Sequence, residues 1–146
     1  MRVSEAMTRD VWVIRPDLTV EDAARAMASL DVGLLPVGEG DCLVGMITDR
    51  DIALRAIGDG KGPATEVAQV MTRDVKYCYE DEDTAHVSRN MAEQQVRRLP
   101  VLNRDKQLVG ILSLADMAQC ETGVREVGSA YRGIAIPGGA HSTGGQ

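Results

Sequence analysis

The chain contains one unit twice, and this internal repeat limits the possible folds more than any other feature of the sequence. The segment MTRDV at 7–11 recurs unchanged at 71–75, which is a shift of 64 residues. With the same shift, LPV at 35–37 recurs at 99–101. Identities at fixed positions, rather than a shared composition, indicate two copies of one supersecondary unit.

Each copy has the hydrophobic pattern of a strand, a helix, two strands and a second helix. Apolar stripes with helical spacing predict the first helices, with Thr19 in position to cap the first of them. A proline in the first strand of each pair predicts a sheet edge or a strand end for that residue. The predicted segments are first strands at 11–14 and 75–79, helices at 20–28 and 84–92, and paired strands at 34–37 with 43–48 and at 98–102 with 108–113. The expected fold class is mixed, α/β in the broad sense and α+β in detail.

Turn-rich and Gly-rich segments divide the chain. The first copy is expected to span residues 1–58 and the second 67–122, joined by a connector at 59–66. Residues 123–146 form a C-terminal extension that is Gly-rich and expected to be disordered after about 133. Helical residues are expected between 124 and 132 within this extension.

Composition excludes several classes of function. With no Phe and one Trp among 146 residues, the core must consist of Val, Leu, Ile, Met and Ala. No two of the three cysteines have the C-x-x-C spacing, so we expect reduced thiols and no zinc site at Cys42, Cys78 and Cys120. A net charge of -6 argues against nucleic-acid binding. Because no apolar run is long enough for a signal peptide or a membrane span, we expect a soluble, cytoplasmic protein without a membrane partner.

One short phrase, G-x-x-[T/S]-x-x-D, closes the strand pair of each copy. A hydroxyl followed three residues later by an acid resembles a capping box, which is the structural explanation of the phrase. It does not explain the glycine or the position at the end of a strand. The members of the phrase are Gly45, Thr48 and Asp51 in the first copy and Gly110, Ser113 and Asp116 in the second.

The functional explanation uses the same strand-to-helix geometry. Backbone N–H groups and the positive end of the helix dipole favour a phosphate there. Glycine permits close approach of the backbone, and the hydroxyl could bond a phosphate or sugar oxygen. The carboxylate suits the two hydroxyls of a ribose better than it suits a phosphate. The phrase therefore indicates a nucleoside phosphate as ligand.

Residues 1 to about 122 resemble a pair of cystathionine β-synthase (CBS) domains, an arrangement called a Bateman module. The matching elements are MT near the start of each copy, the x-L-P-V strand and the complete phrase in both copies. The resemblance implies two β-α-β-β-α repeats packed about a pseudo-twofold axis. It further implies two clefts that bind adenine nucleotides (AMP, ADP or ATP) or S-adenosylmethionine, and a homodimer.

The resemblance also assigns site residues. It places Thr48 and Asp51 in one cleft and Ser113 and Asp116 in the other. The residues implied beside the base are Leu35, Pro36, Leu99, Pro100, Val11 and Val75.

Basic residues supply the phosphate candidates. Arg97 and Arg98 precede LPV in the second copy and resemble a basic pair that holds nucleotide phosphates in the γ subunit of AMP-activated kinase. The alternatives are a solvated strand edge or an ion pair with the acidic run at 80–83. Arg50 is a weaker phosphate candidate. Which cleft the arginine pair serves stays open, and the unequal copies predict clefts of unequal affinity.

Nothing in the sequence indicates catalysis. The histidines are His86, expected on a helix surface, and His141 in the extension, and two aspartates in separate clefts do not form an acid–base pair. The predicted function is a non-catalytic sensor of an adenine nucleotide or S-adenosylmethionine, with no required cofactor or metal. It would act through an unknown effector protein or through its own dimer. The alternative is a dimerising scaffold with empty clefts.

Overall fold

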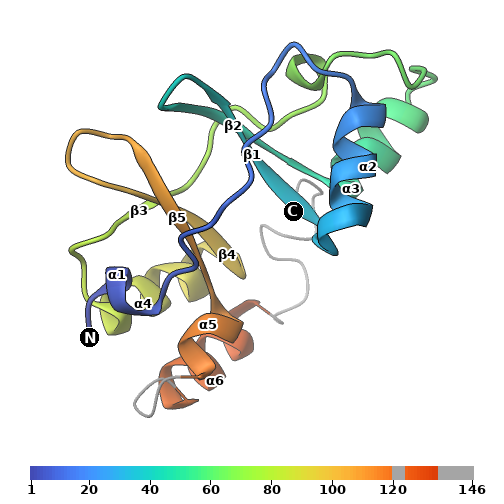
Figure 1. Ribbon diagram of the computed structural model, residues 1–146. Coiled ribbons are helices and arrows are strands. Elements are labelled where there is room, and N and C mark those ends of the chain that lie inside the picture. Colours follow the sequence, from blue (N-terminus) through green and yellow to red (C-terminus); the bar gives the residue numbers. More distant parts are fainter. Residues whose placement is uncertain (120–123, 135–146) are drawn as a thin grey trace. The chain divides into compact units, whose positions relative to one another are not determined.

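The computed structural model describes residues 1–119 and 124–134, which fall into two compact units (Figure 1). Unit 1 contains residues 1–11 together with the described residues from Lys76 onward, and unit 2 contains Trp12–Val75. The first eleven residues therefore pack with the second copy of the repeat. The part of the extension expected to be disordered, 135–146, lies outside the described residues, as do Cys120 and His141.

Unit 2 consists of a strand hairpin and helices from the first copy. Its elements are α2 (Val20–Leu30), β1 (Leu34–Glu39), β2 (Cys42–Thr48), α3 (Asp49–Asp51), the π-helical η1 (Ile52–Ile57) and the short η2 (Val67–Gln69). Strands β1 and β2 form a two-stranded antiparallel sheet. Thr19 caps α2 through a complete capping box, which confirms the predicted start of this helix.

Unit 1 repeats this plan and adds a helix at each end. Its elements are α1 (Val3–Ala6), β3 (Cys78–Tyr79), α4 (Thr84–Gln94), β4 (Arg98–Leu102), β5 (Leu108–Ser113), α5 (Leu114–Ala118) and α6 (Val124–Ile134). The sheet order is β3-β4-β5, with β3 parallel to β4. In Figure 1, α6 lies along α4 and α5, in agreement with their contacts. The mixed fold and the helix predicted at 124–132 are confirmed.

The predicted first strands are shorter than expected. Among residues 11–14 only Ile14 pairs, through a single parallel bridge to Val37, and in the second copy only Cys78 and Tyr79 form a strand. The alternation at 11–14 does not correspond to a strand, because Trp12 and Val13 are both exposed and Ile14 alone is fully buried. Pro16, two residues later, has no N–H with which to extend the pairing.

The prolines of the strand pairs occupy different sheet positions. Pro36 lies in a strand of a two-stranded sheet, so its predicted edge position is confirmed, but Pro100 lies inside the central strand β4, where the prediction is wrong. The Pro36 carbonyl accepts from Ile14 N (3.0 Å), away from β2, so the missing N–H also points away from the hairpin ladder. Strand β3 pairs with β4 only at Val101 and Leu102, so Pro100 interrupts no ladder there.

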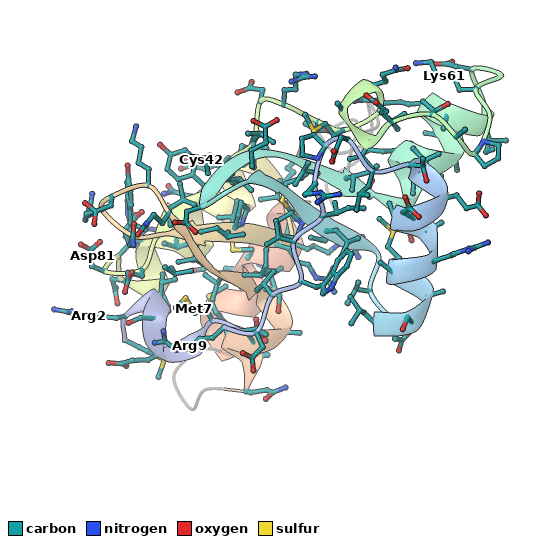
Figure 2. All side chains as sticks on the ribbon, turned by 45° about the horizontal axis from the view of Figure 1, so that its top comes forward. Arg2, Met7, Arg9, Cys42, Lys61 and Asp81 are labelled. Carbon is teal, nitrogen blue, oxygen red and sulfur yellow. The ribbon has the colours of Figure 1, made fainter. Side chains whose placement is uncertain are left out.

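The repeated MTRDV segments account for the division into units. Thr8 pairs with Ile111 of β5 through N···O distances of 2.9 and 3.0 Å, and Thr72 pairs with Met46 of β2 through distances of 2.8 and 2.9 Å. Met7, at the end of α1 (Figure 2), is buried in the core of unit 1. Met71 is buried in the core of unit 2. Each segment thus completes the unit built mainly from the other copy.

Candidate functional site

Both phrases form complete capping boxes where a strand turns into a helix. Thr48 Oγ1 accepts from Asp51 N (3.0 Å), while Asp51 Oδ2 accepts from Thr48 N (3.0 Å). Ser113 and Asp116 make the same pair of bonds at 2.9 and 3.1 Å. The structural explanation of the phrase is therefore confirmed. A functional explanation has to rest on side-chain atoms that the capping bonds do not use.

Capping uses only one oxygen of the Asp51 carboxylate. The side chain is 1% exposed, and Oδ1 has no hydrogen-bond partner among the described residues. The nearest cation, Arg55 Nε, lies 3.9 Å from Oδ1, which is too long for a hydrogen bond. Burial raises the pKa of Asp51, and the bonds from Thr48 oppose that rise. A buried oxygen left without a donor costs about 1–3 kcal/mol, and a donor brought to this atom would recover that free energy.

Thr72 supplies a second buried oxygen without a partner in unit 2. Across residues 1–119 and 124–134, Asp51 Oδ1 and Thr72 Oγ1 are the buried side-chain polar atoms that lack a hydrogen bond. The counterpart of Thr72 in unit 1 is Thr8. The Thr8 Oγ1 lies 3.4 Å from each carboxylate oxygen of Asp116, to which it donates. The carboxylate of unit 1 thus has a hydroxyl donor within the protein, whereas that of unit 2 lacks one.

The raised pKa of Asp51 predicts a pH-dependent stability that Asp51→Asn removes. Between the usual value of 3.8 and the raised pKa, the folded chain holds a proton that the unfolded chain has lost, so stability falls as pH rises through this window. Arg55 lowers and Asp49 raises the pKa, both less than burial does. Unfolding temperatures should be measured from acidic to neutral pH. The unfolding temperature of Asp51→Asn should rise relative to that of the wild type as pH increases. A constant gap would contradict the assignment.

The structure gives both glycines of the phrase a packing partner. A Cβ on Gly45 would lie 2.7 Å from Met71 Sδ and 2.8 Å from the Thr72 carbonyl oxygen. A Cβ on Gly110 would lie 2.7 Å from the Thr8 carbonyl oxygen. The neighbouring MTRDV segment therefore requires glycine at both positions without any ligand. A role of these glycines in ligand approach remains a prediction.

Arg97 and Arg98 lie beside the Ser113 turn of unit 1. Arg98 pairs with Ser113 across the β4–β5 ladder, and the Arg97 carbonyl accepts from Leu114 N (3.1 Å). Both side chains are exposed. Among the described residues, neither arginine forms an ion pair with the acidic run at 80–83, and Asp81 of that run instead binds Arg104 through two bonds of 2.9 and 2.8 Å.

The corresponding positions of unit 2 carry no positive charge. The Gly33 carbonyl accepts from Asp49 N (2.9 Å), and Leu34 pairs with Thr48. Arg50 follows on α3 with its side chain exposed. The two turns therefore differ: one has a buried carboxylate oxygen without a donor, and the other has two adjacent arginines.

The remaining predicted residues divide between the units. Val75 belongs to unit 2 and Val11 to unit 1, and both are half-buried. Thr8 and Thr72 were not predicted as site residues, although their presence in the repeated MTRDV segment was a usable signal. The strand residues Leu35, Pro36, Leu99 and Pro100 are buried, the first pair in unit 2 and the second in unit 1.

Other candidate chemistry lies away from these turns. His86 is exposed on α4, as predicted, 3.7 Å from Glu82. Burial raises the pKa of the Cys78 thiol to about 12, whereas Cys42 is exposed. In the described part of the chain, no group of three or more His, Cys, Asp or Glu side chains is placed to hold a metal ion. Nor does any described helix combine the length and hydropathy needed to cross a bilayer.

The two similar α+β units, each with a carboxylate at a strand-to-helix turn, form a tandem repeat of one domain. The chain belongs to the CBS domain family, which matches residues 3–58 and 67–121. It is 37% identical over 132 residues to the CBS domain-containing protein YhcV of Bacillus subtilis, covering 90% of this chain and 94% of YhcV. CBS domain pairs are regulatory modules.

Solved structures support the same assignment. Hypoxic Response Protein I, solved with two coordinated zinc ions, is 32% identical and covers 82% of this chain and 98% of its own, with a TM-score of 0.74. The CBS domain pair of protein MJ0100, in complex with 5′-methylthioadenosine and S-adenosyl-L-methionine, has a TM-score of 0.72 at 25% identity. That match covers 82% of this chain and 94% of the MJ0100 chain.

Proposed function

We propose that this chain is a regulatory sensor of an adenosine-containing ligand, and that Asp51 accepts hydrogen bonds from the ribose hydroxyls. The observation that carries the proposal is the buried Oδ1 of Asp51, which has no donor among the described residues. Asparagine would cap α3 through one oxygen equally well, so capping does not account for a buried charge. A ribose diol supplies the donors that a carboxylate accepts well.

The ligands of the MJ0100 CBS pair support an adenosine class. Both 5′-methylthioadenosine and S-adenosyl-L-methionine carry a ribose with two hydroxyls, and neither carries a phosphate. The proposal for this chain extends to AMP, ADP and ATP because Arg97 and Arg98 could hold phosphates at the second turn. No cofactor is required in this proposal, and the chain itself performs no catalysis.

The two turns should bind with unequal affinity, Asp51 more tightly than Asp116. At Asp116 a ligand hydroxyl competes with the Thr8 hydroxyl for the carboxylate. At Asp51 the ligand satisfies an oxygen that otherwise stays without a hydrogen bond, so binding recovers a cost already present in the free protein. Thr72 offers a further hydroxyl in the same unit.

Thermal unfolding with a ligand panel tests the proposal. The panel contains AMP, ADP, ATP, S-adenosylmethionine and 5′-methylthioadenosine, with GMP as the control for the base. A ligand that binds only the folded chain stabilises it by about 2.7 kcal/mol at a hundred times its dissociation constant, which is a rise of several degrees. The protein should first be freed of copurified ligand. If none of the panel's ligands then raises its unfolding temperature, the scaffold function is favoured.

Neutralising both arginines should separate phosphate from sugar recognition. In the double variant Arg97→Gln/Arg98→Gln we expect AMP and ATP to bind about tenfold more weakly at the Ser113 turn, with the Asp51 turn unaffected, because two exposed charge-assisted bonds are lost. Binding of 5′-methylthioadenosine, which has no phosphate, should be unchanged. Isothermal titration of both ligands checks this, with Arg104→Gln as a control at an arginine already paired with Asp81. An equal loss for both ligands would rule out a phosphate role.

The output of the sensor would pass through an effector protein or through a homodimer of the chain. The proposed setting is the cytoplasm, without a nucleic-acid or membrane partner. We further propose that residues 1–58 and 67–122, joined by the connector 59–66, are the two duplicated repeats. The first segment of each repeat packs with the unit that is built mainly from the other repeat. The rival function, a dimerising scaffold, would use the phrases only as helix caps.

A further inference from the structure

The two units place the same threonine differently toward the same carboxylate. The backbone of Thr8 pairs with β5 through N···O distances of 2.9 and 3.0 Å, and that of Thr72 pairs with β2 through 2.8 and 2.9 Å. The Thr8 hydroxyl lies 3.4 Å from both carboxylate oxygens of Asp116. The Thr72 hydroxyl, in contrast, has no hydrogen-bond partner among the described residues. Because the backbone pairing is the same, it does not explain this difference.

Arg55 is the charged side chain that lies at the contact left open in unit 2. It belongs to η1 and follows Asp51 by one helical turn. Its Nε lies 3.9 Å from Asp51 Oδ1, and its Nη1 lies 3.5 Å from the carbonyl oxygen of Val70. Val70 comes two residues before Thr72 in the chain. The guanidinium group therefore reaches both the carboxylate and the segment that carries the threonine.

The equivalent position in the second copy has no positive charge. The residue four after Asp116 is Cys120, whereas the residue four after Asp51 is Arg55. A guanidinium group is much larger than a hydroxyl and stays charged at every pH at which the protein is folded. Its Nε stays beyond hydrogen-bond distance of Asp51 Oδ1, so Arg55 does not itself satisfy that oxygen.

We infer that Arg55 is a positioning residue that holds the Asp51 site open by keeping the Thr72 hydroxyl away from Oδ1. A ribose hydroxyl then meets an acceptor that no protein donor has taken. In unit 1, where no arginine follows the carboxylate, Thr8 acts as a competitor built into the chain. The inference rests on the proposed function and adds the reason why the two carboxylates differ in their readiness for a ligand.

A double-mutant cycle without ligand is the first test, with thermal unfolding as the measurement. In Arg55→Gln the Thr72 hydroxyl should donate to Oδ1. Adding Asp51→Asn to that variant should therefore leave the unfolding temperature unchanged or lower it, although the same change is expected to raise it in the wild type. Arg55 is 46% exposed, so its replacement should not prevent folding.

The opposite sign would overturn the inference. If Arg55 acted only through its charge, its loss would leave Asp51 as a buried carboxylate without a neighbouring cation. Asp51→Asn would then raise the unfolding temperature more in the Arg55→Gln variant than in the wild type. The two explanations are thus separated by the direction of the change.

Isothermal titration of 5′-methylthioadenosine is the second test, because this ligand has no phosphate that could respond to the lost charge. Arg55→Gln should weaken binding at the Asp51 turn about tenfold, or about 1.4 kcal/mol. The loss should disappear when Thr72→Val is present in both proteins compared, since valine lacks the hydroxyl. Arg73→Gln is the matched control and should bind as the wild type does, because Arg73 donates to the Ala68 carbonyl (3.1 Å) of the same segment.

The outcomes distinguish this inference from the sensor proposal. If the ligand binds and Arg55→Gln causes no loss, or a loss that persists with Thr72→Val, the inference is wrong and the sensor proposal stands. If 5′-methylthioadenosine does not bind, the ligand-free cycle decides the role of Arg55. The sensor proposal then depends on the other ligands of the panel.

Discussion

Asp51→Asn is expected to raise the unfolding temperature of the ligand-free chain by about 2–4 °C and to weaken adenosine-ligand binding about 10- to 100-fold. The rise follows because the change removes a buried charge with an unpartnered oxygen, at a gain of about 1 kcal/mol, while the amide oxygen still accepts from Thr48 N. The loss follows because one amide oxygen cannot replace a carboxylate that accepts from two ribose hydroxyls.

Asp116→Asn is the matched control for this change. Its carboxylate already has the Thr8 hydroxyl within 3.4 Å, so neutralisation should leave stability unchanged or lower it. Thermal unfolding and isothermal titration of both variants measure the two effects together. A less stable Asp51→Asn variant with unchanged ligand affinity would show that the carboxylate serves the fold, as the scaffold interpretation holds.

Gly45→Val is expected to have the largest effect on stability, a loss of about 3 kcal/mol. Its Cβ would meet the Thr72 carbonyl oxygen at 2.8 Å, and backbone cannot move aside as a flexible side chain can. The MTRDV segment at 71–75 would then separate from β2. At about 2–4 °C for each kcal/mol, the unfolding temperature should fall by about 6–12 °C.

Gly62→Ala provides the comparison for that variant. Nothing lies within 4 Å of a Cβ at Gly62, and its backbone is not left-handed, so alanine should change the unfolding temperature little. Chemical denaturation of the two variants at one pH is sufficient. If Gly45→Val were as stable as Gly62→Ala, the close approach of the 71–75 segment to β2 would be wrong.

The features that the sequence predicted are those determined locally or by repetition. The stripe at 20–28 and the cap at Thr19 fix α2 without reference to the rest of the chain. The capping boxes of Thr48 and Ser113 follow from three-residue spacing. The family is equally visible, because two copies of one phrase with the same strand before them leave few alternatives.

The features that the sequence did not predict depend on contacts between distant segments. Nothing in MTRDV itself says that the segment at 7–11 packs with the second copy, since both strands that could receive it share the pattern L-V-G. The exposure of Trp12 and Val13 likewise depends on which strand Ile14 joins. An unpartnered buried oxygen can be recognised only once every neighbouring donor is placed.

The central claim is that the Asp51 carboxylate binds the ribose hydroxyls of an adenosine ligand. The most direct measurement is isothermal titration of the best ligand of the panel and its 2′-deoxy counterpart, into the wild-type chain and into Asp51→Asn. The claim predicts that the wild type binds the deoxy ligand about tenfold more weakly and that the variant hardly distinguishes the two. The same penalty for the missing hydroxyl in both proteins would contradict it.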